Sequence, residues 1–294
     1  MIKIKRLSDC SFQEAVTAWN LGFTGYLTDV QMTLEVFLNR LVTEGLSTEL
    51  SIIAFDDHKP IGLVLNGIRE LDGKKIAWNG GTGVAPEYRH KGLGKRMMEQ
   101  TLGIYQKQGV DIATLEAIKE NEKAIELYKK MGYIIEDQLL IYANNQSFYS
   151  NPFKNDFSNY EILKVKPSKI QHIPFYKKGL PWQTQWQSVK SGEGVLVLDK
   201  TGICIGYALY KQNENDEGAH VSTMLYQCEI LEGRNDELDI AVFLLSHCFS
   251  PFDQESKRMV LNLSHKNQVV IKLLYEMGFE KKIEQVYMEK TLKK

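Results

Sequence analysis

The chain has 294 residues, of which 43% are hydrophobic and 25% are charged, and its formal net charge is −1. This composition is typical of a soluble globular protein, and the near-neutral charge gives no basic field that would recruit nucleic acid or an anionic membrane. No apolar run approaches the roughly 20 residues of a membrane helix, and the first residues lack the apolar core of a signal peptide. The four cysteines form no C-x-x-C pair, which indicates neither a metal site nor a disulfide framework. We therefore expect a cytoplasmic protein with no bound metal and with neither nucleic acid nor a membrane as partner.

The first half of the chain alternates short strands and helices. Ser11 followed by Glu14 is a capping box that opens a helix, and Asp72-Gly73 is a hairpin turn signal. In chain order the sequence predicts a strand at 2–7, helices at 12–20 and 31–44, strands at 50–56, 60–69 and 75–85, a helix at 93–108, a strand at 111–117, a helix at 122–131 and a strand at 133–142.

The second half repeats this pattern. Ile61-Gly62 recurs as Ile205-Gly206, and Met131-Gly132 recurs as Met277-Gly278 at a nearly equal separation along the chain. Further along, the sequence predicts strands at 194–199, 203–211 and 219–231, a helix at 235–249 and a strand at 258–264. An internal duplication explains both anchors; two unrelated α/β domains with similar turns would not predict equal separations.

A segment without periodicity separates the halves. Residues 144–159 are rich in Asn, Ser and aromatics and include Pro152, which is typical of a connector. We place a first domain at 1–145, a connector at 146–158 and a second domain at 159–294.

The segment after the strand at 75–85 has the composition of an anion site. It reads Val-Ala-Pro-Glu-Tyr-Arg-His-Lys-Gly-Leu-Gly over residues 84–94 and leads into a helix. A helix N-terminus presents unpaired N–H groups and a partial positive charge, and Gly92 and Gly94 let the backbone approach phosphate oxygens. The positive charges of Lys91, Lys95 and Arg96 interact unfavourably with the positive end of the helix macrodipole, and a bound anion would offset this. Taken alone, the segment is also compatible with a basic helix start that binds nothing.

A second motif follows at residues 121–133, with the form N-x-x-A-x-x-L-Y-x-x-x-G-Y. The two motifs together resemble those of the GCN5-related N-acetyltransferase (GNAT) family, over residues 1–145. The resemblance implies an α/β fold with two tandem GNAT-like (acyl-CoA N-acyltransferase) domains, each a central mixed, mostly antiparallel sheet flanked by helices. It also implies that the first domain binds acetyl-CoA as the acetyl donor, without a metal.

The resemblance assigns roles to individual residues. Backbone groups at 84–86 would hold the pantetheine arm and the acetyl carbonyl, the N–H groups of 89–94 would bind the pyrophosphate, and Tyr128 would protonate the departing thiolate. The implied cofactor-binding residues are Val84, Ala85, Pro86, Arg89, His90, Lys91, Gly92, Leu93, Gly94, Lys95 and Asn121.

Acyl transfer from a thioester to an amine needs a proton donor for the thiolate and an acceptor for the amine's protons. Tyr128 can donate a proton at neutral pH, although it is also one member of an apolar stripe on its helix. Glu116 is the nearest acidic candidate for the base, at a position that resembles the base of the ribosomal-protein alanine acetyltransferase branch. A solvated charge at a strand edge, or a mechanism in which water carries the proton away, is equally compatible with the sequence.

The run Gly80-Gly81-Thr82-Gly83 lies within the strand at 75–85. Glycine inside a strand commonly marks a bulge or a close backbone approach. We expect a bulge whose N–H groups face the acetyl oxygen as an oxyanion hole; the alternative is a merely weak strand.

Aromatic residues mark a candidate acceptor side. The resemblance suggests that the loop after the first helix lines the acceptor cleft, so we expect Phe23, Tyr26 and the strand residue Trp78 to contact the acceptor. Trp19 fits core packing at least as well.

The second half keeps the topology but not the phosphate loop. Asp236, Glu237 and Asp239 would place carboxylates at the corresponding helix start and repel a pyrophosphate, and Leu274 occupies the position of Tyr128. We expect this half not to bind acetyl-CoA. Its aromatic residues Phe175, Tyr176, Trp182 and Trp186 either extend the acceptor cleft or belong to the core.

Two functions follow from these observations. The first is an acetyl-CoA-dependent N-acetyltransferase that acts on a primary amine of a small molecule or a protein. The second is a CoA-binding sensor or scaffold without turnover. The sequence does not identify the acceptor, because specificity in this fold lies in variable loops.

Overall fold

The computed structural model describes residues 1–146, 152–153, 157–253 and 255–292. The connector predicted at 146–158 lies mostly outside the described residues. The chain divides into two compact units, Met1–Glu136 with Val286–Lys294, and Asp137–Gln285.

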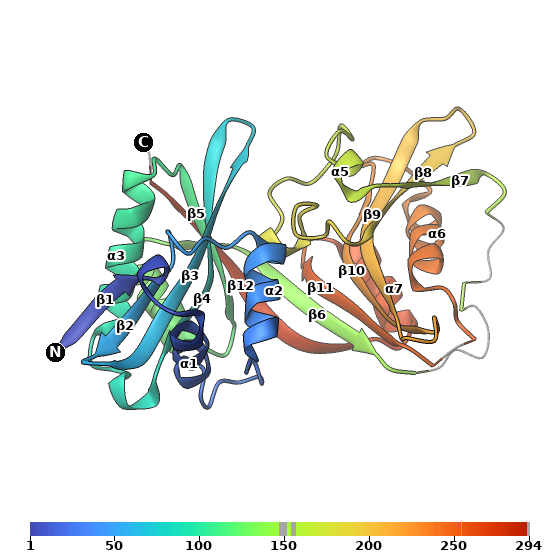
Figure 1. The fold of residues 1–294 in the computed structure, drawn as a ribbon. Helices are drawn as coiled ribbons and strands as arrows, with labels where there is room; N and C mark the ends of the chain where they lie inside the picture. The colour runs from blue at the N-terminus through green and yellow to red at the C-terminus, as the bar shows by residue number, and fades with distance from the viewer. Residues whose placement is uncertain (147–151, 154–156, 254, 293–294) are drawn as a thin grey trace. The chain divides into compact units, whose positions relative to one another are not determined.

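The first unit is a mixed sheet covered by helices on both faces (Figure 1). Its helices are α1 (Phe12–Gly22), α2 (Leu34–Glu44), α3 (Leu93–Lys107) and α4 (Glu122–Lys130). Its strands are β1 (Ile2–Arg6), β2 (Ile52–Asp56), β3 (Lys59–Leu71), β4 (Lys74–Val84), β5 (Ile112–Ile118) and the end of β12 (Glu280–Thr291). The strands lie in the order β1-β2-β3-β4-β5-β12. The pairs from β1 to β4 are antiparallel and β4 pairs with β5 in parallel, which confirms the predicted mostly antiparallel sheet.

Local signals explain where these elements begin and turn. The capping box is present: the Ser11 side chain accepts from the N–H of Glu14, and the Glu14 carboxylate accepts from the N–H of Ser11. Thr33 caps α2 through the same type of contact, and α2 ends at Gly45 with a left-handed φ of 65°. Asp72 and Gly73, at φ 50° and 74°, form the predicted turn between β3 and β4.

The two faces of this sheet carry different helices. Ala113, Leu115 and Ala117 of β5 pack with Met98 of α3 and Tyr128 of α4 in one buried cluster. Because side chains alternate along a strand, the intervening residues of β5 face the opposite side. On that side a Cβ at Gly81 would meet the Trp19 ring of α1. Thus α3 and α4 cover one face, and α1 covers the other.

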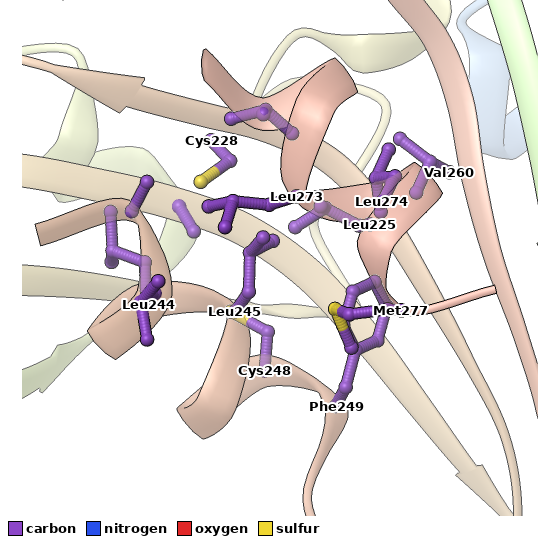
Figure 2. Close-up of a cluster of buried hydrophobic side chains, with 14 of the residues drawn as sticks. Leu225, Cys228, Leu244, Leu245, Cys248, Phe249, Val260, Leu273, Leu274 and Met277 are labelled. Atoms are coloured by element: carbon purple, nitrogen blue, oxygen red, sulfur yellow. The ribbon is translucent and has the colours of Figure 1, made fainter. Parts of the chain in front are cut away.

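The second unit repeats the plan. Its strands are β6 (Ile134–Asn144), β7 (Tyr160–Val165), β8 (Glu193–Asp199), β9 (Cys204–Glu214), β10 (His220–Ile230) and β11 (Lys257–Ser264), in the order β6-β11-β10-β9-β8-β7. Its helices are α5 (Pro167–Ile170), α6 (Glu237–Phe249) and α7 (Gln268–Glu276). Strands β7 and β12 and the short helix α5 were not predicted from the sequence. Side chains of α6, α7, β10 and β11 fill one hydrophobic core, including Leu225, Leu245 and Leu274 (Figure 2).

The duplicated anchors have the same geometry in both units. Asn121 and Asn267 are the N-caps of α4 and α7, with φ, ψ of −85°, 61° and −84°, 68°, and each side chain accepts from the N–H three residues on. Met131 and Met277 end these helices, each followed by a left-handed glycine. This agreement supports an internal duplication.

The two halves of the chain exchange their last strands. β6, which ends the first half, pairs with β11 of the second unit, from Leu139↔Ser264 to Asn144↔Arg258. The end of β12 returns to the first unit, where Val286 and Met288 join the core cluster of Tyr128. Each compact unit therefore contains a strand from the other half of the sequence.

Candidate active site

The loop after β4 presents an open helix N-terminus. β4 ends at Val84, a short 3₁₀ turn covers Pro86–Tyr88, and α3 begins after Gly92. Gly92 is left-handed at φ 81°, it provides no side-chain cap, and the first turn of α3 holds no acidic residue. The first N–H groups of a helix have no partner within it, so those of Leu93, Gly94 and Lys95 are available to a ligand.

The surroundings of this helix start fit an anion. Lys91, Lys95 and Arg96 are exposed beside it, and a Cβ placed on Gly92 would meet nothing within 4 Å. The ion pair of Lys95 with Glu99 is long, at 3.7 Å, and exposed. Cations at a helix N-terminus are unfavourable without a counter-ion. The arrangement therefore suits a bound phosphate.

Arg89 has a different place from the one that the sequence suggested. Its guanidinium donates to the carbonyls of Val84 at 2.9 Å, Gly22 at 3.1 Å and Thr24 at 2.7 Å. Its backbone N–H already donates to the Pro86 carbonyl at 3.2 Å. Arg89 thus joins the end of α1 to the end of β4, and its N–H and its side chain are occupied within the fold.

Tyr128 is buried on α4, with 7% of its surface exposed. Burial raises the pKa of its phenol to about 12, against the effect of a hydrogen bond with the Thr82 side chain of β4, and Tyr26 adds to the rise. A phenol with this pKa stays protonated at neutral pH and can donate. Thr82 in turn accepts from Asn79 Nδ2 at 2.8 Å. A short chain of polar side chains thus connects Tyr128 to β4.

β4 contains the predicted bulge. The antiparallel register with β3 passes from Asn66↔Asn79 to Leu65↔Gly81, which leaves Gly80 as the extra residue. Gly80 and Gly81 consequently face the same side: a Cβ on Gly80 would meet Leu46, and a Cβ on Gly81 would meet the Trp19 ring at 2.8 Å. Gly81 has a φ of 154°, a value that residues other than glycine rarely adopt. Glycine is required at the bulge by both space and conformation.

The parallel pairing of β4 with β5 ends where the bulge begins. It runs from Ile76↔Ile112 to Asn79↔Leu115, and the strands separate beyond that point. The separated segments carry Gly80–Val84 on one side and Glu116–Ile118 on the other. A gap of this kind leaves strand-edge backbone groups without a strand partner, so that a ligand can pair with them.

Glu116 lies at this gap, on the face opposite to Tyr128. Its Oε2 accepts from the Trp78 indole at 2.7 Å, and its buried Oε1 has no hydrogen-bond partner among the described residues. Burial raises the pKa of Glu116 to about 7; the Trp78 bond lowers it, the Glu44 carboxylate raises it and the Arg40 guanidinium lowers it. A carboxyl group with this pKa can accept a proton near neutral pH.

The aromatic residues of the first helix and its loop form a contiguous stack. The ring centroids of Trp19 and Phe23 are 4.3 Å apart, and those of Phe23 and Tyr26 are 5.1 Å apart. The Tyr26 hydroxyl interacts with the Asn121 side chain, which opposes a rise in the Tyr26 pKa that burial causes. Phe23 and Tyr26 are half-buried, whereas Trp78 is only 2% exposed. The Trp78 ring therefore offers almost no surface to an acceptor, and its indole donates to Glu116.

The corresponding helix start in the second unit carries acidic residues in place of the cations beside α3. Asp236 is the N-cap residue of α6, and Glu237 and Asp239 lie in its first turn. The Asn267 side chain donates across to the Cys228 carbonyl of β10 at 2.8 Å. Leu274, at the position of Tyr128, is completely buried among aliphatic side chains, beside Leu225 and Val260 (Figure 2).

The aromatic residues of the second half belong to its core. Tyr176 is 8% exposed and Trp182 is 4% exposed, and Phe175 and Trp186 pack against the cluster that contains Tyr176. The Tyr176 hydroxyl donates to Gln185 at 2.6 Å. Of the two interpretations from sequence, core packing fits these contacts.

Three contributors to the site were missed at the sequence level: Arg40, Asn79 and Thr82. Arg40 donates to the Gly80 carbonyl at 2.6 Å, and Asn79 accepts from the N–H of Gly81 at 3.0 Å. The i, i+4 spacing of Arg40 and Glu44 was a visible signal of an ion pair, but nothing local ties that pair to β4.

Comparison with known proteins agrees with this geometry. Residues 16–133 match the model of the acetyltransferase (GNAT) family, whereas no curated protein matches the chain. A tandem GNAT protein from the clavulanic acid biosynthesis pathway is similar over 99% of this chain and 98% of its own, with a TM-score of 0.65 and 10% identity. A GCN5-related N-acetyltransferase from Sphaerobacter thermophilus is similar over 99% of this chain and 95% of its own, with a TM-score of 0.65 and 13% identity. A putative acetyltransferase from Pyrococcus horikoshii is similar over 100% of this chain and 89% of its own, with a TM-score of 0.61 and 16% identity.

No group of three or more His, Cys, Asp or Glu among the described residues could hold a metal ion, and no described helix is long and apolar enough to cross a membrane. The structural likenesses establish a tandem GNAT fold, and the motifs of the first half match the family model. Residues 16–133 thus match the acetyltransferase (GNAT) family, and the chain has the fold of a tandem GNAT protein.

Proposed function

We propose that the protein is an acetyl-CoA-dependent N-acetyltransferase whose first unit carries the whole reaction. It transfers the acetyl group to a primary amine of a small molecule or a protein. One observation carries the proposal. At the end of β4, an uncapped and cation-rich helix start adjoins a gap in the sheet, and a buried phenol and a buried carboxyl group lie on opposite faces of that gap.

The donor fits the loop at the start of α3. The N–H groups of 90–94 and the nearby lysines suit the pyrophosphate, and the backbone of 84–86 suits the pantetheine amides. Arg89 contributes by holding the loop, since its own N–H is bonded to Pro86. Asn121, whose side chain interacts with Tyr26, is assigned to the pantetheine arm in this proposal.

The chemistry divides between the two faces. Bound acetyl-CoA supplies the thioester carbonyl that the amine attacks. Glu116, with a pKa near 7, takes a proton from the incoming ammonium group and passes it to water. Tyr128 donates its proton to the thiolate sulfur as the C–S bond breaks, and the second proton of the amine nitrogen restores the phenol. The overall products are an acetamide, the CoA thiol and one proton.

The bulge has a role in the same scheme. The N–H of Gly81 is held by Asn79, so the N–H of Gly80 is the candidate donor of this glycine pair to a developing oxyanion, which preorganised N–H groups stabilise. Because Glu116 and Tyr128 face different sides of the sheet, the group that deprotonates the ammonium and the group that protonates the thiolate do not contact each other.

The second unit supports the fold without binding the donor in this proposal. The acids at the start of α6 repel a pyrophosphate, and Asn267 occupies the place where the sheet would open. We also expect a cytoplasmic protein, because all four of its cysteines are free.

Calorimetry with acetyl-CoA and the full chain tests the donor site. We expect one site per chain, and Gly92→Glu should weaken binding on the order of 100-fold, because it places a carboxylate against the phosphates. Glu120→Gln, an exposed change elsewhere on the same unit, is the control and should bind as the unaltered protein does. Unchanged affinity in Gly92→Glu would remove the loop from the donor site, and two sites per chain would contradict the assignment of the second unit.

Assay of the free thiol with a library of amines then tests turnover. Release of CoA that depends on the amine, with an acetylated product, supports a transferase. Tight binding of acetyl-CoA without release in the presence of any amine would favour the sensor or scaffold instead.

A further inference from the structure

Arg40 of α2 makes three contacts, of which only the i, i+4 pair with Glu44 was visible in the sequence. Its Nη2 donates to the Gly80 carbonyl at 2.6 Å and its Nε donates to Glu44 Oε2 at 2.8 Å. Its guanidinium carbon lies 4.6 Å from the centroid of the Trp19 ring. The Arg40 side chain is only 16% exposed and that of Glu44 14%. This is a largely enclosed ion pair, and the planar fork of arginine is what lets one side chain serve two acceptors and a ring together.

The Gly80 contact acts on the bulge. As the extra residue, Gly80 has a carbonyl outside the regular ladder. Arg40 binds that carbonyl, while Asn79 Oδ1 accepts from the N–H of Gly81, at the other end of the same peptide. A peptide group held at both its oxygen and its hydrogen cannot rotate, so the orientation of the bulge is fixed from both faces of the sheet.

The same pair lies beside Glu116. The groups that face the Glu116 carboxyl are Trp78 of β4, Arg40 and Glu44 of α2, and Tyr287 of β12. Trp78 is uncharged, and burial keeps the Tyr287 phenol protonated by raising its pKa. The charge that Glu116 meets is therefore set by Arg40 and Glu44, which act in opposite directions.

We propose that Arg40 is a positioning residue of the acetyl transfer, which clamps the Gly80–Gly81 peptide of the bulge and, paired with Glu44, sets the charge around the Glu116 carboxyl group. This inference rests on the proposed function, because it assigns Arg40 to the bulge and base of that reaction. Arg40 itself touches no reacting atom. Its two roles are separable, since a lysine keeps the charge but loses the fork.

The Trp78 indole provides a direct readout of Glu116. Because the indole N–H donates to Glu116 Oε2, its resonance in the ¹⁵N-labelled full chain should follow the protonation of that carboxyl group. Trp78→Phe identifies the signal, and Glu116→Gln should abolish its titration. In the unaltered protein the midpoint is expected near pH 7.

Two charge variants should move this midpoint in opposite directions. Arg40→Gln removes a cation and should raise it by about one pH unit, whereas Glu44→Gln removes an anion and should lower it. Glu35→Gln, an exposed charge change on the same helix, is the matched control and should leave it unchanged. A purely structural role would not give shifts of opposite sign. Shifts of the same sign, or none, would overturn the electrostatic part.

Arg40→Lys tests the clamp. It should keep the indole midpoint within a few tenths of a pH unit and still lower kcat by about 10-fold or more, with little change in the affinity for acetyl-CoA. Full kcat in Arg40→Lys would overturn the clamp. If Arg40→Gln does not fold, the lysine and Glu44 variants still decide both parts.

Failure of this inference can be told from failure of the proposed function. An unaltered protein that acetylates no amine contradicts the proposed function. An unaltered protein that acetylates an amine, together with Arg40 variants that match it in kcat and in indole midpoint, contradicts the role of Arg40 alone.

Discussion

Glu116→Gln should make the protein more stable at high pH and inactive at every pH. The physical reason is the raised pKa of the buried carboxyl group. Its ordinary value is 4.5 and its value in the folded chain is about 7. Between these values the folded chain keeps a proton that the unfolded chain has released. The free energy of unfolding therefore falls as the pH rises through this window, and it stays lowered above about pH 7.

The size of the effect follows from the width of the window. Each pH unit between 4.5 and about 7 costs roughly 1.4 kcal/mol, so the full penalty is about 3 kcal/mol as an upper bound. Glutamine has no proton to lose, and its amide oxygen can still accept from the Trp78 indole. The free energy of unfolding of Glu116→Gln should thus exceed that of the unaltered protein by almost nothing near pH 4.5. The excess should grow with pH and approach about 3 kcal/mol near pH 7.

Urea unfolding between about pH 5 and about pH 8 measures this difference. Glu35→Gln is the control, because the Glu35 side chain is exposed. The difference in unfolding free energy between Glu35→Gln and the unaltered protein should not change with pH. A stability difference for Glu116→Gln that does not change with pH, or one that falls as the pH rises, would refute the burial argument and with it the assignment of Glu116 as a base near neutral pH.

Two other substitutions test the remaining parts of the site. Tyr128→Phe should lower kcat by roughly 100-fold or more while leaving acetyl-CoA affinity nearly unchanged, because it removes a proton donor; steady-state kinetics beside calorimetry check this, and equal turnover would exclude Tyr128 as the acid. Gly81→Ala should destabilise the first unit by about 2 to 4 kcal/mol, because its Cβ would lie 2.8 Å from the Trp19 ring at a φ of 154°. Thermal unfolding measures the loss, and Gly103→Ala, where a Cβ meets nothing within 4 Å, is the control that should not lose stability.

Local patterns were sufficient for most of the first unit. The capping box of Ser11 and Glu14, the Asp72-Gly73 turn and the bulge at Gly80 depend on residues within a few positions of one another, so their chemistry is legible in the sequence. The cap at Asn121 is a local contact of the same kind, although from the sequence Asn121 was assigned only to the cofactor.

Contacts between distant segments were not predictable in this way. Arg40 and Gly80 are far apart in the chain, and neither residue type indicates the other. Arg89 lies in a motif read as a phosphate loop, yet its guanidinium donates to the carbonyls of Gly22 and Thr24 on another element. Trp78 was expected at the acceptor, and only the fold shows that its indole bonds to Glu116. Side-chain partners of this kind follow from tertiary packing rather than from spacing.

The exchanged strands restrict what can happen to the chain in evolution and in the laboratory. A gene fragment that ends after the first half would encode every residue of the proposed site, but it would lack the end of β12, whose Val286 and Met288 pack in the core beside Tyr128. The same fragment would carry β6 without β11, its partner in the pairing from Leu139 to Asn144. Deletion of the second half would thus leave an apolar gap and an unpaired strand edge, which favours aggregation. The exchanged strands thus give a structural reason to retain a half that has no phosphate loop, because it completes the core of the other half.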